Sequence, residues 1–166
     1  MSLLERIRLV CLEKLLTALR RWRRHGSRAD LPAHLLTGLE GESAAYFHLR
    51  RQGYTVVAQR WTEPGLGGDL DLIAWQGPVL CFVEVKTRTA RDAMPAELAV
   101  DAEKRATLRK MARRYLRHLP GESPPQVRFD ILSVYLIPGR KTEFEHFENA
   151  FGWSERRPGD RWGDRN

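Results

Sequence analysis

The most constraining stretch of the sequence is residues 79–86, where two charged residues lie inside an otherwise apolar run. The run is short, β-branched and entered from a Gly-Pro turn, which predicts a buried strand. Because alternate residues of a strand point to opposite faces, Phe82, Glu84 and Lys86 share one face. A buried carboxylate and ammonium are costly unless they are paired or bind an ion. A simple Glu–Lys pair and a functional site are therefore both open interpretations.

A second acidic strand precedes this one. Residues 69–75 alternate between apolar and polar side chains, which predicts a strand that carries Asp71. If residues 76–77 are the whole turn, Asp71 lies opposite Phe82 and diagonal to Glu84 on the same face. A turn longer by one residue would put the two acids on opposite faces.

A helix carries a third inward carboxylate. Thr37 and Glu40 form a capping-box pattern, which predicts a helix from Thr37 to about residue 52, with Gly53 as its stop. Glu42 falls on the apolar stripe of this helix. A carboxylate in that position needs a partner, unless it reaches solvent at the edge of the helix.

A later helix, predicted at residues 97–119, is strongly basic. Lys104 lies four residues before Leu108 and so points inward with the apolar stripe, toward the acids of the sheet. The other basic residues spread over the opposite side of the helix. We expect these, together with one arginine that follows the central strand, to contact nucleic acid: Arg88, Arg109, Lys110, Arg113, Arg114 and Arg117.

The net charge of +7 is concentrated in two regions. Residues 1–30 hold eight Lys and Arg against three acidic residues, and residues 98–119 hold seven against two. Two local basic faces favour a polyanionic partner, although solvated helix faces would also explain them. The two cysteines lie far apart and the histidines lack ligand spacing, so neither a disulfide framework nor a zinc site is predicted. We expect a reducing, cytoplasmic location.

The chain divides into three parts. Residues 1–30 are predicted to be a basic amphipathic helix, at 3–24, and a linker; residues 31–152 the main folded domain; and residues 153–166 a flexible polar tail. The helix could lie on a membrane surface, contact nucleic acid, or pack on the main domain or a second copy of the chain. No apolar run approaches the roughly 20 residues that span a bilayer.

Further strands are predicted at residues 54–61, 127–137 and 142–147. The order helix, strand, strand, strand, helix, strand, strand predicts an α/β domain with a central mixed sheet flanked by helices. Glu42, Asp71 and Glu84 offer the hard oxygen ligands that Mg²⁺ prefers. Lys86 could orient an attacking water or stabilise charge at a phosphate.

The spacing of Asp71 and Glu84-Val85-Lys86 resembles the D…(D/E)xK signature of restriction-endonuclease-like nucleases. The surrounding motifs are similar, in order, to those of the YraN family, a bacterial family of endonuclease-like proteins of largely unassigned function that resembles archaeal Holliday-junction resolvases. The resemblance covers residues 36–152. Its motifs are Gly38-x-x-Gly41-Glu42, Gly53-Tyr54, Gly68-Asp69-Leu70-Asp71-Leu72-Ile73-Ala74, Phe82-Val83-Glu84-Val85-Lys86-Thr87-Arg88, Arg128-Phe129-Asp130 and His146-Phe147-Glu148-Asn149-Ala150-Phe151.

The resemblance implies a restriction-endonuclease-like core. Glu42, Asp71 and Glu84 would bind Mg²⁺, or Mn²⁺ in its place, Lys86 would be the catalytic lysine, and Lys104 matches a lysine that the family keeps. The implied activity is hydrolysis of phosphodiester bonds in DNA, branched or damaged. The alternative is a nucleic-acid-binding module that does not cleave. A resolvase-like enzyme would act as a symmetric homodimer.

Overall fold

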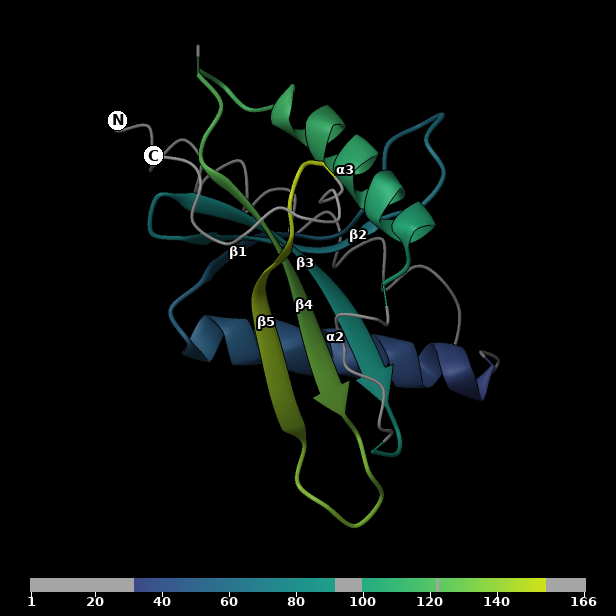
Figure 1. Cartoon of the computed structure of the whole chain (residues 1–166). Helices are drawn as coiled ribbons and strands as arrows, with labels where there is room; N and C mark the ends of the chain where they lie inside the picture. The colour runs from purple at the N-terminus through teal and green to yellow at the C-terminus, as the bar shows by residue number, and fades with distance from the viewer. Residues whose placement is uncertain (1–31, 92–99, 122, 155–166) are drawn as a thin grey trace, which may run out of the picture.

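The computed structural model describes residues 32–91, 100–121 and 123–154. The helix predicted at residues 3–24 and residues 155–166 of the predicted polar tail lie outside the described residues. The described part is an α/β structure in which two helices cover a five-stranded sheet (Figure 1). Its elements are α2 (Ala33–Arg51), β1 (Thr55–Trp61), β2 (Leu70–Gln76), β3 (Val79–Arg88), α3 (Ala102–Leu116), β4 (Val127–Tyr135) and β5 (Glu143–Phe151).

The sheet is mixed, as the sequence predicts, and its strands follow chain order from β1 to β5. Neighbouring strands are antiparallel except β3 and β4, which are parallel and are joined through α3. A parallel pair needs such a crossover connection, because the chain must return to the starting end of the sheet. Within the described residues, neither helix is long and apolar enough to cross a membrane.

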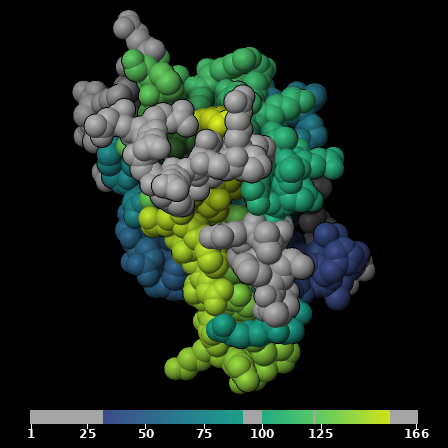
Figure 2. Space-filling view, viewed as in Figure 1, coloured from purple at the N-terminus to yellow at the C-terminus, as the bar shows by residue number. Residues whose placement is uncertain are grey.

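Each face of the sheet has its own apolar core. On one face, Leu49 of α2 packs with Leu72 and Val83. On the other face, Met111 of α3 packs with Phe82. The strand alternation predicted for β3 is therefore confirmed. Figure 2 shows the N-terminal end of α2 at one side of the molecule and its C-terminal end at the other, so this helix spans the width of the sheet.

The turn between β2 and β3 differs from the prediction by one position. Gln76 pairs with Val79, so Gly77 and Pro78 form the turn. Gly77 takes a φ of +56°, and a proline suits the second turn position, where φ is negative. The register therefore shifts by two residues, which keeps every side chain on its predicted face.

The start of α2 was predicted wrongly. The helix begins at Ala33 after Pro32, about one turn before Thr37. The hydroxyl of Thr37 donates a hydrogen bond to the carbonyl oxygen of Ala33, 3.0 Å away, so it is a residue within the helix and not a cap. The predicted end is confirmed, because Gly53 follows the helix with a φ of +87°.

The start of α3 and the end of β5 also differ from the prediction. Helix α3 begins after Asp101, whose side chain accepts a hydrogen bond of 2.7 Å from the backbone N–H of Lys104. Strand β5 extends to Phe151 and not to residue 147, with Asn149 at a φ of +54°. The carboxylate of Asp130 accepts the N–H of Asn149 at 2.9 Å, and this bond holds the irregularity that lets the strand continue.

Candidate functional site

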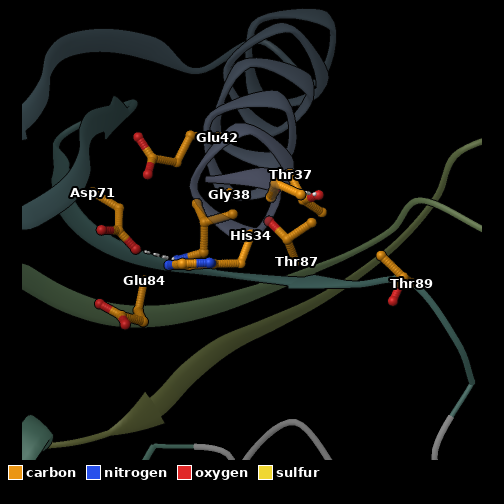
Figure 3. A pocket seen from close by; sticks show the side chains of 10 residues that line it. His34, Thr37, Gly38, Glu42, Asp71, Glu84, Thr87 and Thr89 are labelled. Carbon is orange, nitrogen blue, oxygen red and sulfur yellow. Dashed lines mark hydrogen bonds between the residues drawn. The ribbon is translucent and has the colours of Figure 1, made fainter. Parts of the chain in front are cut away.

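A pocket of about 530 Å³ lies where the first turns of α2 cross β2 and the C-terminal half of β3. Its lining includes all three carboxylates that the sequence predicts to bind a metal. In Figure 3, these carboxylates lie on one side of the pocket and three threonines on the other, with the side chain of His34 between them. The lining residues are Ala33, His34, Thr37, Gly38, Glu42, Asp71, Glu84, Val85, Thr87 and Thr89.

Asp71 and Glu84 are neighbours across the β2–β3 hairpin. Leu72 pairs with Val83, so the next position of the register brings Asp71 beside Glu84. Both are buried, with exposed fractions of 8% and 3%. Oδ2 of Asp71 accepts a hydrogen bond of 2.7 Å from the backbone N–H of Val85. Burial, followed by the charge of Glu84, raises the pKa of Asp71 to about 7.

Two lysines pair with Glu84. Nζ of Lys86 lies 2.9 Å from Oε1 of Glu84, and Nζ of Lys104 lies 3.2 Å from Oε2. Burial alone would lower the pKa of Lys104, but the charges of Glu84 and Asp71 outweigh it and the pKa is raised. The inward placement of Lys104 is therefore confirmed, and so is the Glu–Lys pair that a purely structural interpretation of β3 predicts.

Glu42 is half-buried and forms an ion pair, as its place on the apolar stripe of the helix predicts. Its Oε2 lies 3.7 Å from Nε of Arg60 on β1. Burial raises the pKa of Glu42 and Arg60 opposes this effect. Arg60 was missed by sequence reasoning. Its φ of +47° is unusual for an arginine, and no sequence pattern distinguishes this residue from the rest of its strand.

Gly41 lets α2 approach the sheet at this point. A Cβ atom on Gly41 would lie 1.8 Å from Oγ1 of Thr87 on β3, which is far inside contact distance. The absence of a side chain at position 41 therefore allows the two backbones to come together. Since Glu42 is the next residue, this contact also brings its carboxylate into the same pocket as Asp71 and Glu84.

The donors of this pocket suit Mg²⁺ in kind. They are carboxylate oxygens, and Mg²⁺ needs only one or two of these when water and phosphate complete its shell. Within residues 32–91, 100–121 and 123–154, no three Asp, Glu, His or Cys side chains are grouped closely enough to hold one ion as they stand. Asp71 and Glu84 could serve as two ligands, whereas Glu42 would have to leave Arg60 to become a third.

The residues predicted to contact nucleic acid do not form one surface. Lys110, Arg113 and Arg117 are exposed. Arg109 is only 6% exposed, and its Nε donates to the carbonyl oxygen of Gly152 at 2.7 Å. Its placement on the basic surface was therefore wrong, because the sheet edge covers it. Arg114 is exposed but pairs with Glu63 at 2.6 Å, and Arg88 is half-buried at the end of β3.

Sequence reasoning also missed a buried polar network at the N-terminal end of β4. Arg128 donates to both carboxylate oxygens of Asp130, at 2.8 and 2.9 Å, and to the hydroxyl of Tyr54 at 2.9 Å. Nε2 of His146 lies 3.1 Å from Asp130. Burial would raise the pKa of Asp130, but hydrogen bonds from His146 and Arg128 lower it. These contacts join β4, β5 and the connection between α2 and β1.

A family model and individual relatives all point to one protein family. A family model described as "Uncharacterised protein family UPF0102" matches residues 41–134. A UPF0102 protein of Koribacter versatilis is 53% identical over 122 residues, which are 74% of this chain and 83% of that protein. A UPF0102 protein of Solibacter usitatus is 48% identical over 107 residues, covering 64% of this chain and 80% of that protein.

A relative of lower identity is matched over a similar share of its length. A UPF0102 protein of Porphyromonas gingivalis is 42% identical over 115 residues, which are 69% of this chain and 82% of that protein. The matched region contains both acidic strands and the helix that carries Lys104. The resemblance to the YraN family is thereby confirmed, and the chain belongs to that family, UPF0102.

Proposed function

We propose that this protein is a metal-dependent endonuclease that hydrolyses phosphodiester bonds in DNA. The observation that carries this proposal is the meeting of Asp71 and Glu84 in one pocket, with Lys86 and Lys104 both in contact with Glu84. Two buried carboxylates side by side are costly for the fold, which favours a role that needs them. The order of strands around these residues also agrees with a restriction-endonuclease-like core.

Each residue has a distinct task in this proposal. Asp71 and Glu84 would hold Mg²⁺, or Mn²⁺ in its place, and Glu42 would add a third oxygen ligand on leaving Arg60. When bound, the ion lowers the pKa of a water molecule and offsets the charge that develops at the scissile phosphate. Lys86 orients the attacking water, and Lys104 balances the negative charge of Glu84. Exposed basic residues of α3, such as Lys110 and Arg117, bind backbone phosphates.

Asp71→Ala and Lys86→Ala test the proposal. Each variant should lose metal-dependent cleavage of DNA and retain most of its DNA binding. Lys141→Ala serves as a matched control, because this lysine is exposed in the turn between β4 and β5, away from the pocket. Cleavage by both Asp71→Ala and Lys86→Ala at the wild-type rate would disprove the assignment.

A nucleic-acid-binding module is the second candidate. One observation favours it: both lysines and Arg60 already pair with the pocket carboxylates, which is what a purely structural role for these charges requires. A module of this kind should bind DNA equally well with and without Mg²⁺. The endonuclease should bind DNA more tightly when a divalent cation that does not support cleavage, such as Ca²⁺, fills the carboxylate site.

A further inference from the structure

Helix α2 carries a second apolar stripe on the side that faces away from the sheet. The stripe, called here the outer stripe, consists of Leu35, Leu36, Leu39 and Phe47. Because these positions are separated by three, four or eight residues, they lie on one side of the helix. The side chain of Leu35 is 48% exposed and that of Phe47 is 59% exposed. The helix is therefore apolar on both its inner and its outer side.

The inner side of α2 is fully used by the sheet. Gly41, Ala45 and Leu49 are buried there, and the helix packs against β1, β2, β3 and β4. Helix α3 lies on the other face of the sheet (Figure 1). Within the described part of the chain, Leu35 and Phe47 thus remain open to solvent. Contiguous apolar side chains on a surface mark a place where another element binds.

The N-terminal segment of the same chain matches the outer stripe in pattern and in length. The sequence predicts a helix at residues 3–24 with an apolar stripe of its own, made of Leu4, Ile7, Cys11, Leu15, Ala18, Leu19 and Trp22. At 1.5 Å per residue, this helix would be about 33 Å long and α2, with 19 residues, is about 28 Å long. The two stripes could therefore meet along the whole of α2.

The connection between the two segments favours an antiparallel arrangement. Only residues 25–32 separate the predicted helix from α2, and they include Gly26 and Ser27, which suit a turn. Two antiparallel helices need no more than a short turn between them. In a parallel arrangement the connection would have to run back along the full length of α2, for which eight residues at about 3.6 Å each barely suffice.

The charges favour the same direction. In α2, Glu40 and Glu42 lie in the first half, whereas Arg50 and Arg51 lie in the last turn. Residues 14–24 contain five Lys and Arg and no acidic residue, whereas residues 1–13 contain two Arg and two Glu. Antiparallel packing brings the five basic residues beside the acidic half of α2. Parallel packing would bring them beside Arg50 and Arg51, where they would be repelled.

We propose that residues 3–24 form a helix that packs antiparallel on the outer stripe of α2 in the same chain. Trp22 then lies near Leu35, and Cys11 lies near Ser43 and Phe47. The first turns of α2 line the carboxylate pocket, so the packed segment also carries the arginines of residues 20–24 to the side of that pocket. Positive charge there attracts an anionic ligand. The packing itself does not depend on the endonuclease function.

Cross-linking through Cys11 tests the packing in the full chain. Ser43→Cys adds a second thiol on the exposed outer side of α2 at almost unchanged size, while Cys81 is buried. A bismaleimide of about 8 Å spans the distance between packed helices. Internally linked monomer should form about tenfold faster in Ser43→Cys than in Leu35→Cys, because packing fixes Cys11 near position 43. A freely moving segment would instead favour Leu35→Cys, which is nearer to the point of attachment.

Two controls separate packing from chance contact. Adding Cys11→Ser to Ser43→Cys should abolish the linked monomer. Adding Leu15→Glu, on the apolar stripe of the segment, should slow its formation about tenfold, whereas Leu16→Glu, on the other side, should not. Faster linking of Leu35→Cys than of Ser43→Cys, or no linking of either, would overturn the proposal. Linked dimers in place of linked monomers would also overturn it and would assign the outer stripe to a second copy of the chain.

Discussion

Lys104 of α3 and Glu84 of β3 form an ion pair in which Nζ lies 3.2 Å from Oε2. The carboxylate is 3% exposed, whereas the lysine side chain is 30% exposed. Glu84 thus pairs with a lysine on the face of the sheet that α3 covers, and it also lines the pocket beneath α2. This pair links the packing of α3 to the charge of the candidate site.

Lys104→Met should lower the free energy of unfolding by about 1 kcal/mol at pH 8, since it leaves a buried carboxylate with one lysine in place of two. The exposed part of the lysine keeps the effect small. Urea unfolding measures it, with exposed Lys110→Met as the control, which should change stability by less than about 0.5 kcal/mol. Equal stability of the two variants would contradict the pairing.

Asp71 should make the stability of the metal-free protein fall as pH rises from about 4 to about 7. Its pKa is raised from 3.8 to about 7 in the folded state, so the folded protein binds the extra proton in this window. Asp71→Asn removes that loss and should be more stable than wild type at pH 8, on the order of 1–3 kcal/mol. Urea unfolding from pH 4.5 to 8 checks it, with exposed Glu40→Gln as control. Parallel pH profiles for wild type and Asp71→Asn would count against it.

Two glycines of α2 should respond in opposite ways to alanine. Gly41→Ala places a Cβ atom 1.8 Å from Oγ1 of Thr87 and should destabilise the fold by about 1–3 kcal/mol. Gly38→Ala meets no atom within 4 Å and should stabilise the helix by about 0.5–1 kcal/mol. Thermal unfolding compares them directly. A destabilised Gly38→Ala together with an unchanged Gly41→Ala would show that the α2–β3 contact differs from the one described.

Replacing Arg60 by asparagine should stabilise the protein. Its φ of +47° lies in the left-handed region, where asparagine is tolerated much better than a long side chain. Arg60→Asn should therefore raise the free energy of unfolding by about 0.5–1 kcal/mol, because the exposed pair with Glu42 contributes little. Arg60→Lys keeps the unfavourable backbone and should bring no gain. A loss of stability in Arg60→Asn would mean that the ion pair outweighs the backbone effect.

Two neighbouring basic residues of α3 should separate folding from binding. Arg109→Met should lower stability, since Arg109 is buried against Phe151 and donates to Gly152. Lys110→Met should leave stability unchanged and reduce the salt dependence of DNA binding by about one unit of slope. Binding measured between 50 and 200 mM salt provides the test. The reverse pattern would place Arg109, and not Lys110, at the DNA surface.

The sequence predicts the faces of the strands well because alternation has a period of two. The register of the hairpin was predicted with the wrong turn residues, yet the shift of two positions left Asp71 and Glu84 on one face. The inward direction of Lys104 followed from helical spacing alone. The partner of Glu42 could not be predicted, because Arg60 comes from a different element and only the packed structure brings the two together.

The burial of Arg109 was not predictable for a related reason. Its partners lie in the last residues of β5 and just beyond it, and the sequence predicts that this strand ends at residue 147. The extension depends on Asp130, which holds the backbone of Asn149 from the neighbouring strand. A contact between distant strands of this kind has no local signature. The start of α2 was predicted wrongly because a threonine can bond to the backbone either as a cap or within a helix. Thr37 does the latter: its hydroxyl donates to the carbonyl oxygen of Ala33, one turn earlier.

The central claim is metal-dependent cleavage by the Asp71–Glu84 pocket. The most direct measurement is cleavage of single-stranded, duplex, flap and four-way-junction DNA in Mg²⁺ and in Mn²⁺, with wild type beside Glu84→Ala. The endonuclease proposal predicts that wild type cuts at least one of these structures only when the metal is present, and that Glu84→Ala does not. Tight, salt-dependent binding with no cutting by wild type would contradict it and would identify the protein as a binding module.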